Sequence, residues 1–290
     1  MSRQSTRQQD LQLLTCSSFL ENAILPPPLI IDKDDPLVSV GTTLLAKEVS
    51  CAVIRDKNGV YKSIQPYQII SLLLQSKPDE MYGLLYEPVS KFVDAVSPSS
   101  LPLVHSDDPF AKALTKMGKN RFTDVMVLDD HDLPSGMFSV RNVVRFLSGR
   151  TDSIGMSLEE VSSRLIPVDG EESIIDVFRF MVRNRVKRAV IKEGEAFYCC
   201  TESEAMSRIF SFAGLNLLRD DPDTLLKMPI EWLVHPFQNH VPSLSGGLDV
   251  AEGWIQASWT SNCTLVVDDE RIATPWDLVM KPFESGKLIV

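Results

Sequence analysis

A hydroxyl and an acid stand three residues apart near the end of the chain, in the stretch RIATPWDLVM. Thr274 precedes Pro275, and Asp277 lies two residues further on. This spacing is typical of a capping box, in which the N-cap side chain and the third helical side chain satisfy each other's backbone amides. A hydroxyl and a carboxylate at a helix start could also bind a ribose diol with a phosphate nearby. The turn alone is compatible with both interpretations.

Three other turns place two polar residues at the same spacing. The corresponding pairs are Ser139 with Asn142, Thr201 with Glu204, and Gln65 with Gln68. The first two pairs keep a hydroxyl followed by an amide or an acid, whereas the glutamine pair has neither a hydroxyl nor an acid. The pattern therefore holds in three of the four turns.

Each turn follows a short, strongly apolar run that predicts a buried strand. The runs are CAVIRD, DVMVLDD, RAVIKEG and CTLVVDDE, and charged turn residues close each of them. A segment that can form a helix precedes each run, most clearly at residues 174–182, where apolar residues follow the i, i+3, i+4, i+7, i+8 pattern. A further apolar stretch precedes each helix. The sequence thus predicts an α/β (α+β) fold of four repeats, each of strand, helix, strand, strand and helix.

This order of elements, with a hydroxyl and an acid at the start of the last helix, resembles the cystathionine-beta-synthase (CBS) domain family. TPWDLVMKP is similar to the closing motif of single-chain archaeal members, and VRNRVKRAVI is similar to their approach to the third strand. Four repeats resemble two tandem Bateman modules with pseudo-twofold symmetry. The expected segments are an N-terminal tail and lead-in helix at 1–22, a degenerate first repeat at 23–76, and further repeats at 88–150, 158–213 and 228–285.

The resemblance implies clefts between paired repeats that accept adenosine compounds. The family's ribose-binding acid or amide corresponds to Asp277, Asn142 and Glu204, and its hydroxyl corresponds to Thr274, Ser139 and Thr201. Ala273, directly before the threonine, is included in the expected nucleotide site. Gln68 stands where an acid belongs, which puts the first cleft in doubt.

Basic residues lie between the predicted helix and central strand of two repeats. Arg185 and Arg188 occupy this place in the third repeat and Arg121 in the second, where the family often places phosphate groups. The alternative is that cations near a helix C-terminus complement its dipole and remain solvated. Because the chain is acidic overall, the concentration of cations at residues 179–188 favours a site for a small anion.

Composition limits the classes of function. The chain has 290 residues, 44% of them apolar, and a formal net charge of −10, so we expect a globular protein without a nucleic-acid partner. Five scattered cysteines fit a reducing compartment. No apolar run approaches the ~20 residues of a membrane span, and the first residues lack the apolar core of a secretory signal. We therefore expect a soluble, cytoplasmic protein without a membrane partner.

No constellation in the sequence indicates catalysis or a metal site. The pairs of adjacent aspartates, such as Asp129 and Asp130, fall in turns, where aspartate is favoured for backbone hydrogen bonding. No cysteine or acid stands at metal-ligand spacing from His235 and His240 in the sequence.

The leading hypothesis is a non-catalytic regulatory protein, with an energy-sensing role, that binds AMP, ADP, ATP or a related adenosine compound as a ligand and uses no other cofactor. Its signal would pass to an unidentified protein partner. The resemblance implies a disc of two modules, formed within one chain or by a homodimer. The alternative is a structural or protein-interaction module with vestigial clefts.

Overall fold

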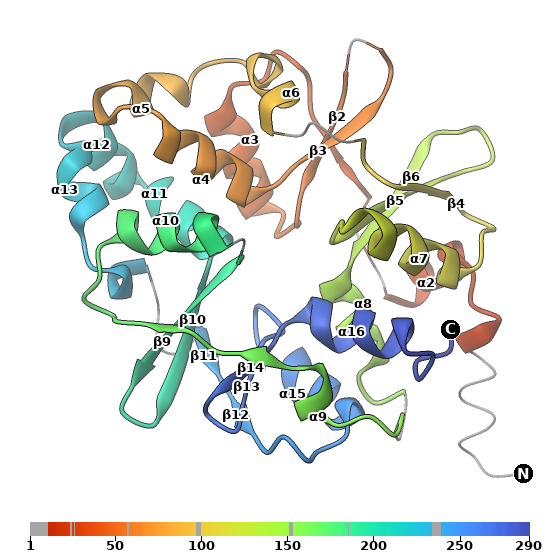
Figure 1. Cartoon of the computed structure of the whole chain (residues 1–290). Helices are drawn as coiled ribbons and strands as arrows, with labels where there is room; N and C mark the ends of the chain where they lie inside the picture. The colour runs from red at the N-terminus through yellow and green to blue at the C-terminus, as the bar shows by residue number, and fades with distance from the viewer. Residues whose placement is uncertain are drawn as a thin grey trace, which may run out of the picture. The chain divides into compact units, whose positions relative to one another are not determined.

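The computed structural model describes residues 11–23, 25, 27–56, 58–96, 100–150, 153–184, 186–233 and 239–290, without the side chains of 95 and 96. The chain divides into two compact units (Figure 1). Unit 1 consists of Met1–Pro28, Leu101–Ile166 and His240–Val290, and unit 2 consists of Leu29–Ser100 and Pro167–Asn239. Each unit therefore contains one repeat from each half of the chain.

Unit 2 contains the first and third repeats. The first repeat comprises β1 (Leu29–Ile30), α3 (Leu37–Ala46), β2 (Ala52–Arg55), β3 (Tyr61–Ile64) and α4 (Pro66–Gln75). The third comprises β8 (Pro167–Val168), α10 (Ile174–Asn184), β9 (Arg188–Glu193), β10 (Ala196–Thr201) and α11 (Glu202–Ile209). The remaining elements are α5 (Pro78–Leu84), η1 (Val89–Lys91), α6 (Val93–Val96), α12 (Phe212–Asp220), α13 (Pro222–Lys227) and η2 (Ile230–Leu233).

Unit 1 contains the second and fourth repeats. The second comprises β4 (Leu103–His105), α7 (Phe110–Asn120), β5 (Asp124–Leu128), β6 (Pro134–Ser139) and α8 (Val140–Leu147). The fourth comprises β12 (Ser243–Leu244), α15 (Val250–Ser258), β13 (Leu265–Val267), β14 (Arg271–Ala273) and α16 (Pro275–Glu284). The remaining elements are α2 (Cys16–Ala23), α9 (Leu158–Val161), β7 (Ser163–Arg164) and β11 (His240–Val241). The predicted α/β fold of four strand–helix–strand–strand–helix repeats is confirmed.

The sheets have the same topology in every repeat. The first strand pairs parallel to the central strand, as where Leu103 lies opposite Met126, and the third strand pairs antiparallel to it, as where Ser139 lies opposite Asp124. The parallel pair needs a crossover connection, which the first helix supplies, whereas a short turn is enough for the antiparallel pair. In the fourth repeat β7 adds a further antiparallel strand beside β14.

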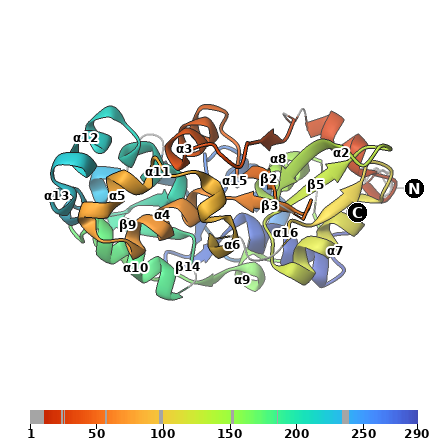
Figure 2. The same ribbon diagram turned by 90° about the horizontal axis from the view of Figure 1, so that it is seen from above.

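Helices from the two repeats of each unit build its core. In unit 2, α11 packs against α3 and α4, and α10 packs against α4, so that these helices lie together in both ribbon views (Figures 1 and 2). A Cβ at Gly41 of α3 would lie 2.0 Å from Cε2 of Phe210, the C-cap residue of α11. Only glycine allows this close approach. In unit 1, α8 packs against α15 and α16.

The acidic pairs have the turn role that the sequence predicts. Oδ1 of Asp129 accepts hydrogen bonds from the backbone amides of His131 at 2.8 Å and Leu133 at 2.9 Å. Asp268 and Asp269 adopt positive φ angles of 50° and 59°, a conformation that aspartate tolerates better than most residues. Across the described residues, no group of three or more His, Cys, Asp or Glu side chains is placed to hold a metal ion.

No helix formed by the described residues combines the length and the apolar character that crossing a lipid bilayer requires.

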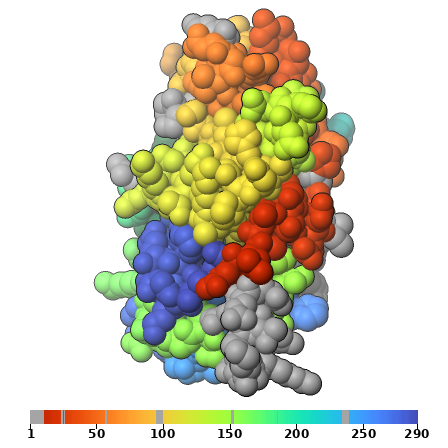
Figure 3. Space-filling view, turned by 90° about the vertical axis from the view of Figure 1, so that its right-hand side faces the viewer, coloured from red at the N-terminus to blue at the C-terminus, as the bar shows by residue number. Residues whose placement is uncertain are grey.

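The N-terminal helix α2 is part of the core of unit 1. Phe19 is fully buried, and its ring stacks on Phe110 with centroids 4.5 Å apart and contacts Phe138 and Phe146. Figure 3 shows this N-terminal segment, in red, lying against the yellow residues of the second repeat. The lead-in helix predicted from the sequence therefore fills space inside the second repeat.

We predict that Phe19→Ala lowers the free energy of unfolding by about 3–5 kcal/mol, because it leaves a cavity between three aromatic rings. Urea denaturation monitored by circular dichroism measures this change. The control is Leu13→Ala, whose side chain is 82% exposed and whose removal should change stability by less than about 0.5 kcal/mol. Equal effects of the two substitutions would show that α2 is not part of the core.

Candidate functional site

The turn before α16 forms a complete capping box. The backbone amide of Thr274 donates to Asp277 Oδ2 at 3.0 Å, and the Thr274 hydroxyl donates to the same oxygen at 2.7 Å. In return, the backbone amide of Asp277 donates to Thr274 Oγ1 at 3.4 Å. The capping interpretation is confirmed for this turn, and Asp277 is buried. Ala273, which precedes the box, is fully buried in the core of unit 1, so only its backbone can reach a ligand.

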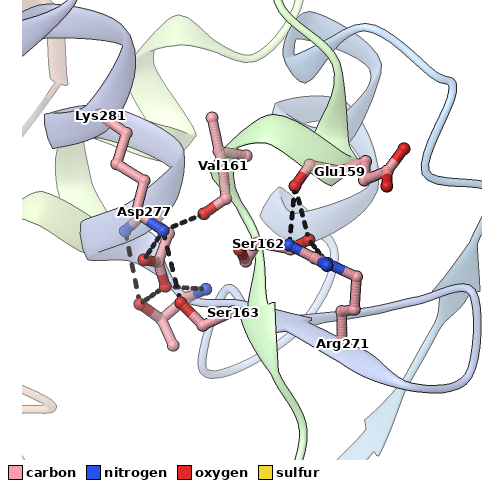
Figure 4. Close-up of polar contacts among 8 residues, drawn as sticks. Glu159, Val161, Ser162, Ser163, Arg271, Asp277 and Lys281 are labelled. Atoms are coloured by element: carbon pink, nitrogen blue, oxygen red, sulfur yellow. Dashed lines mark hydrogen bonds and ion pairs between the residues drawn. The ribbon is translucent and has the colours of Figure 1, made fainter.

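The second oxygen of Asp277 is held by a lysine one helical turn further on. Lys281 Nζ lies 2.9 Å from Asp277 Oδ1, and it also donates to the carbonyl of Val161 and to Ser163 Oγ (Figure 4). Lys281 was not among the site residues expected from the sequence. Its i, i+4 spacing from Asp277 is the signal that could have found it.

Arg271, a second cation of the fourth repeat, also binds the segment that contains Val161 and Ser163. Arg271 Nε donates to Ser162 Oγ at 2.8 Å, and its Nη2 donates to the carbonyls of Glu159 and Ser162, both at 3.1 Å (Figure 4). Together with the pairing of β7 to β14, Arg271 and Lys281 hold residues 159–163 against the start of α16.

The turn of the second repeat forms the same box with an amide. The backbone amide and the hydroxyl of Ser139 both donate to Asn142 Oδ1 at 2.9 Å. An amide oxygen has two lone pairs, and both are used here. Asn142 therefore offers a ligand the N–H groups of its amide, and no further acceptor.

The turn of the third repeat uses only one oxygen of its acid. The backbone amide of Thr201 donates to Glu204 Oε2 at 2.9 Å, and the Thr201 hydroxyl donates to the same oxygen. Among the described residues, Glu204 Oε1 has no hydrogen-bond partner. Arg188 lies directly opposite Thr201 in the β9–β10 pair, and directly opposite residues project to the same face of a sheet. The Nε of Arg188 is buried and has no partner within the described part of the chain.

The turn of the first repeat keeps the box although it lacks a hydroxyl and an acid. The backbone amide of Gln65 donates to Gln68 Oε1 at 2.7 Å. Lys187, from the third repeat, donates to Gln65 Oε1 at 3.1 Å, and its Nζ lies 4.6 Å from the centre of the Tyr67 ring. The glutamine pair therefore caps α4 and also receives a cation from the other repeat of unit 2.

The predicted cations have different environments. Arg188 lies beside the Thr201 turn, as described above. Arg121 is exposed and is the C-cap residue of α7, with a φ of 54°, and no hydrogen bond among the described residues joins its side chain to Ser139 or Asn142. Arg185 lies outside the described residues, as does His235. Lys187 belongs to the basic run of the sequence but was not among the expected site residues.

Glu202, the first residue of α11, is the most perturbed carboxyl near these turns. Burial raises its pKa from the ordinary value of 4.5 to about 6, and the charges of Lys187 and Arg188 oppose this shift. The cost of desolvating the carboxylate is therefore larger than its attraction to the two cations. The carboxylate is ionised at neutral pH but is less stable there than in water.

We predict that Asp277→Asn keeps the capping box, because Asn142 forms the same two bonds with an amide oxygen. The variant should still lose about 1 kcal/mol of stability, because the half-buried ion pair with Lys281 is broken. Chemical denaturation of Asp277→Asn, Lys281→Met and the double variant forms the test. A coupling energy near zero in this cycle would contradict an energetic role for the pair.

We also predict a pH dependence for Glu202. Between pH 4.5 and pH 6 the folded state binds more protons at this carboxyl than the unfolded state does, so the free energy of unfolding decreases as pH rises through this window. Glu202→Gln removes this decrease, so the stability of the variant relative to the unmodified chain should rise by about 2 kcal/mol between pH 4.5 and pH 7.5. Glu195→Gln, at an exposed turn position, is the control. Parallel stability curves for Glu202→Gln and the unmodified chain would refute the prediction.

One segment of the chain matches a known family by sequence, and the whole chain is similar to solved structures by fold. The model of the CBS domain family matches residues 93–149, which lie within the predicted second repeat. No curated protein sequence matches the chain. The structure is similar to protein MJ1225 of Methanocaldococcus jannaschii, described as a candidate archaeal homologue of g-AMPK, with a TM-score of 0.74, 15% identity and coverage of 91% of this chain and 99% of that one.

A second similar structure is a conserved, uncharacterised protein of Pyrococcus horikoshii. Its TM-score is 0.53 at 16% identity, and the match covers 90% of this chain and 98% of that one. At these identities the two structures show a shared fold. Residues 93–149 are therefore a CBS domain by sequence, and the chain as a whole shares its fold with these two archaeal proteins.

Proposed function

We propose that this protein binds adenine nucleotides at the turns that start the last helix of its repeats, and that it acts as a non-catalytic regulatory protein. The proposal rests chiefly on the third repeat, where two groups have no partner among the described residues. They are Glu204 Oε1 and the buried Nε of Arg188, which lies opposite Thr201. An acceptor and a cation are the two groups that a ribose phosphate needs.

The acceptor capacity of each turn suggests how well it suits a ribose. A carboxylate can accept about four hydrogen bonds. Glu204 uses two of these in its capping box, so it can accept both the 2′- and 3′-hydroxyls. Asp277 uses three, because Lys281 occupies its second oxygen. Asn142 has no acceptor left. We therefore expect the Thr201–Glu204 turn to bind ribose most strongly, followed by the Thr274–Asp277 turn.

The phosphate is proposed to bind Arg188. A guanidinium is always charged at neutral pH and can donate two parallel hydrogen bonds to phosphate oxygens. An Nε without a partner is costly when it is buried, and an anion would remove this cost. Arg185 and Arg121 stay secondary candidates from the sequence.

A regulatory output requires a ligand that prefers one of two arrangements of the protein. At the fourth repeat, a ribose hydroxyl on Asp277 Oδ1 would share that oxygen with Lys281, which also contacts Val161 and Ser163. Binding would therefore alter the contacts of the segment between the second and third repeats. We propose that a protein partner, or a second copy of the chain, responds to this change, as an energy-sensing role would require.

Isothermal titration calorimetry with AMP, ADP, ATP and GTP tests the proposal. We expect saturable binding of at least one adenine nucleotide in the micromolar range and weaker binding of GTP. Glu204→Gln should retain the cap, as Gln68 does, but should lower affinity for AMP about ten- to a hundred-fold, since it loses a charged acceptor for the ribose. Arg188→Gln should lower the affinity for AMP and leave the affinity for adenosine nearly unchanged.

The matched control is Glu195→Gln, an exposed residue in the turn between β9 and β10. Because several turns can bind ligand, a crystal structure of each variant soaked with AMP should show which turn has lost occupancy. No heat with any adenine nucleotide would reject the proposal. Equal losses for AMP and adenosine in Arg188→Gln would leave this arginine with a structural role only.

A further inference from the structure

A pocket of about 280 Å³ lies in unit 2, between α4 of the first repeat and α10 and α11 of the third. Its wall is apolar: Ile70, Phe178 and Met181 line it and are almost fully buried. Two more lining residues, Val182 and Val186, are 53% and 40% exposed. Exposed valines beside a buried apolar wall leave a surface that a small apolar group would cover.

Two opposite charges line the same pocket. Lys187 donates to Gln65 Oε1 at 3.1 Å and lies over the ring of Tyr67. An ammonium group has three N–H donors, so donors remain for a ligand. Glu202 is the acid of the pocket. Its carboxylate forms no ion pair within 4.0 Å with Lys187 or any other described residue.

The two charges are close enough to influence each other. The ammonium of Lys187 lowers the pKa of Glu202, although burial raises it more. The pocket therefore holds a cation and an anion that interact electrostatically but form no ion pair. A ligand with one charge would satisfy one of the two groups and leave the other without a counter-charge in an apolar setting, which is unfavourable.

We propose that this pocket binds a free α-amino acid with an apolar side chain, with its α-carboxylate on Lys187 and its α-ammonium on Glu202. The side chain would pack against Ile70, Phe178 and Met181. A pocket of about 280 Å³ has room for a small apolar amino acid such as leucine or methionine.

This site is separate from the proposed nucleotide site but adjacent to it. Lys187 directly precedes Arg188, and Glu202 directly follows Thr201. The amino acid would contact the two residues next to the proposed ribose and phosphate groups. The chain would thereby respond to an amino acid as well as to a nucleotide.

Calorimetry on the full chain without nucleotide tests the inference. The probes are L-leucine, 4-methylpentanoate, which lacks the ammonium, and 3-methylbutan-1-amine, which lacks the carboxylate. We expect saturable binding of one leucine per chain, with each single-charge analogue at least about tenfold weaker. L-methionine should bind like leucine.

Two variants locate the binding. Lys187→Met and Glu202→Gln should each lower the affinity for leucine at least about tenfold. Lys77→Gln and Glu195→Gln remove the same charges from exposed positions of unit 2 and should leave leucine binding unchanged. Thermal melting of each variant confirms folding. If a variant fails to fold, the analogue series on the unmodified chain still decides the question.

The inference is overturned if neither leucine nor methionine binds, or if either single-charge analogue binds as tightly as leucine. It is also overturned if the exposed controls weaken leucine as much as the pocket variants do. A titration with AMP on the same preparation separates the two proposals. Leucine binding without AMP binding would support this site and reject the nucleotide site, and the reverse result would do the opposite.

Discussion

At the start of the last helix of every repeat, one side-chain oxygen accepts a hydrogen bond from the backbone amide of the N-cap residue. Asp277, Glu204, Asn142 and Gln68 all supply this oxygen at 2.7–3.0 Å. Because the cap needs only one acceptor, an acid and an amide serve equally well for the helix. The second terminal atom of the side chain can therefore be an oxygen or a nitrogen without loss of the cap. The four repeats differ chemically at this atom.

The surroundings of that second atom separate the turns. At Asp277 it is an oxygen paired with Lys281, which also holds the segment before the third repeat. At Glu204 it is an oxygen without a described partner, in the turn whose Thr201 lies opposite Arg188. The same local motif therefore serves chiefly for tertiary contact in the fourth repeat, and it leaves a charged group available to a ligand in the third.

The first repeat, which departs most from the pattern, has a role in placing a cation. Its Gln65 accepts a hydrogen bond from Lys187, and Tyr67 lies under the same ammonium group. An acid in place of Gln68 would add a charge near this lysine and compete for it. The amide pair instead keeps the cap neutral, so that Lys187 retains donors at the edge of the apolar pocket.

Local sequence determined the elements and their caps, because the apolar periodicity and the hydroxyl-x-x-acid spacing act over three to eight residues. The strands of the four repeats, a helix over residues 174–182, and the Thr274–Asp277 and Thr201–Glu204 boxes could be predicted in this way. Only the tertiary structure decided which repeats share a core, the second with the fourth and the first with the third. It also decided the bonds from Lys281 to Val161 and from Lys187 to Gln65, which join residues 120 and 122 positions apart. Such contacts depend on how helices from distant repeats pack, and no local pattern of residue types encodes that choice.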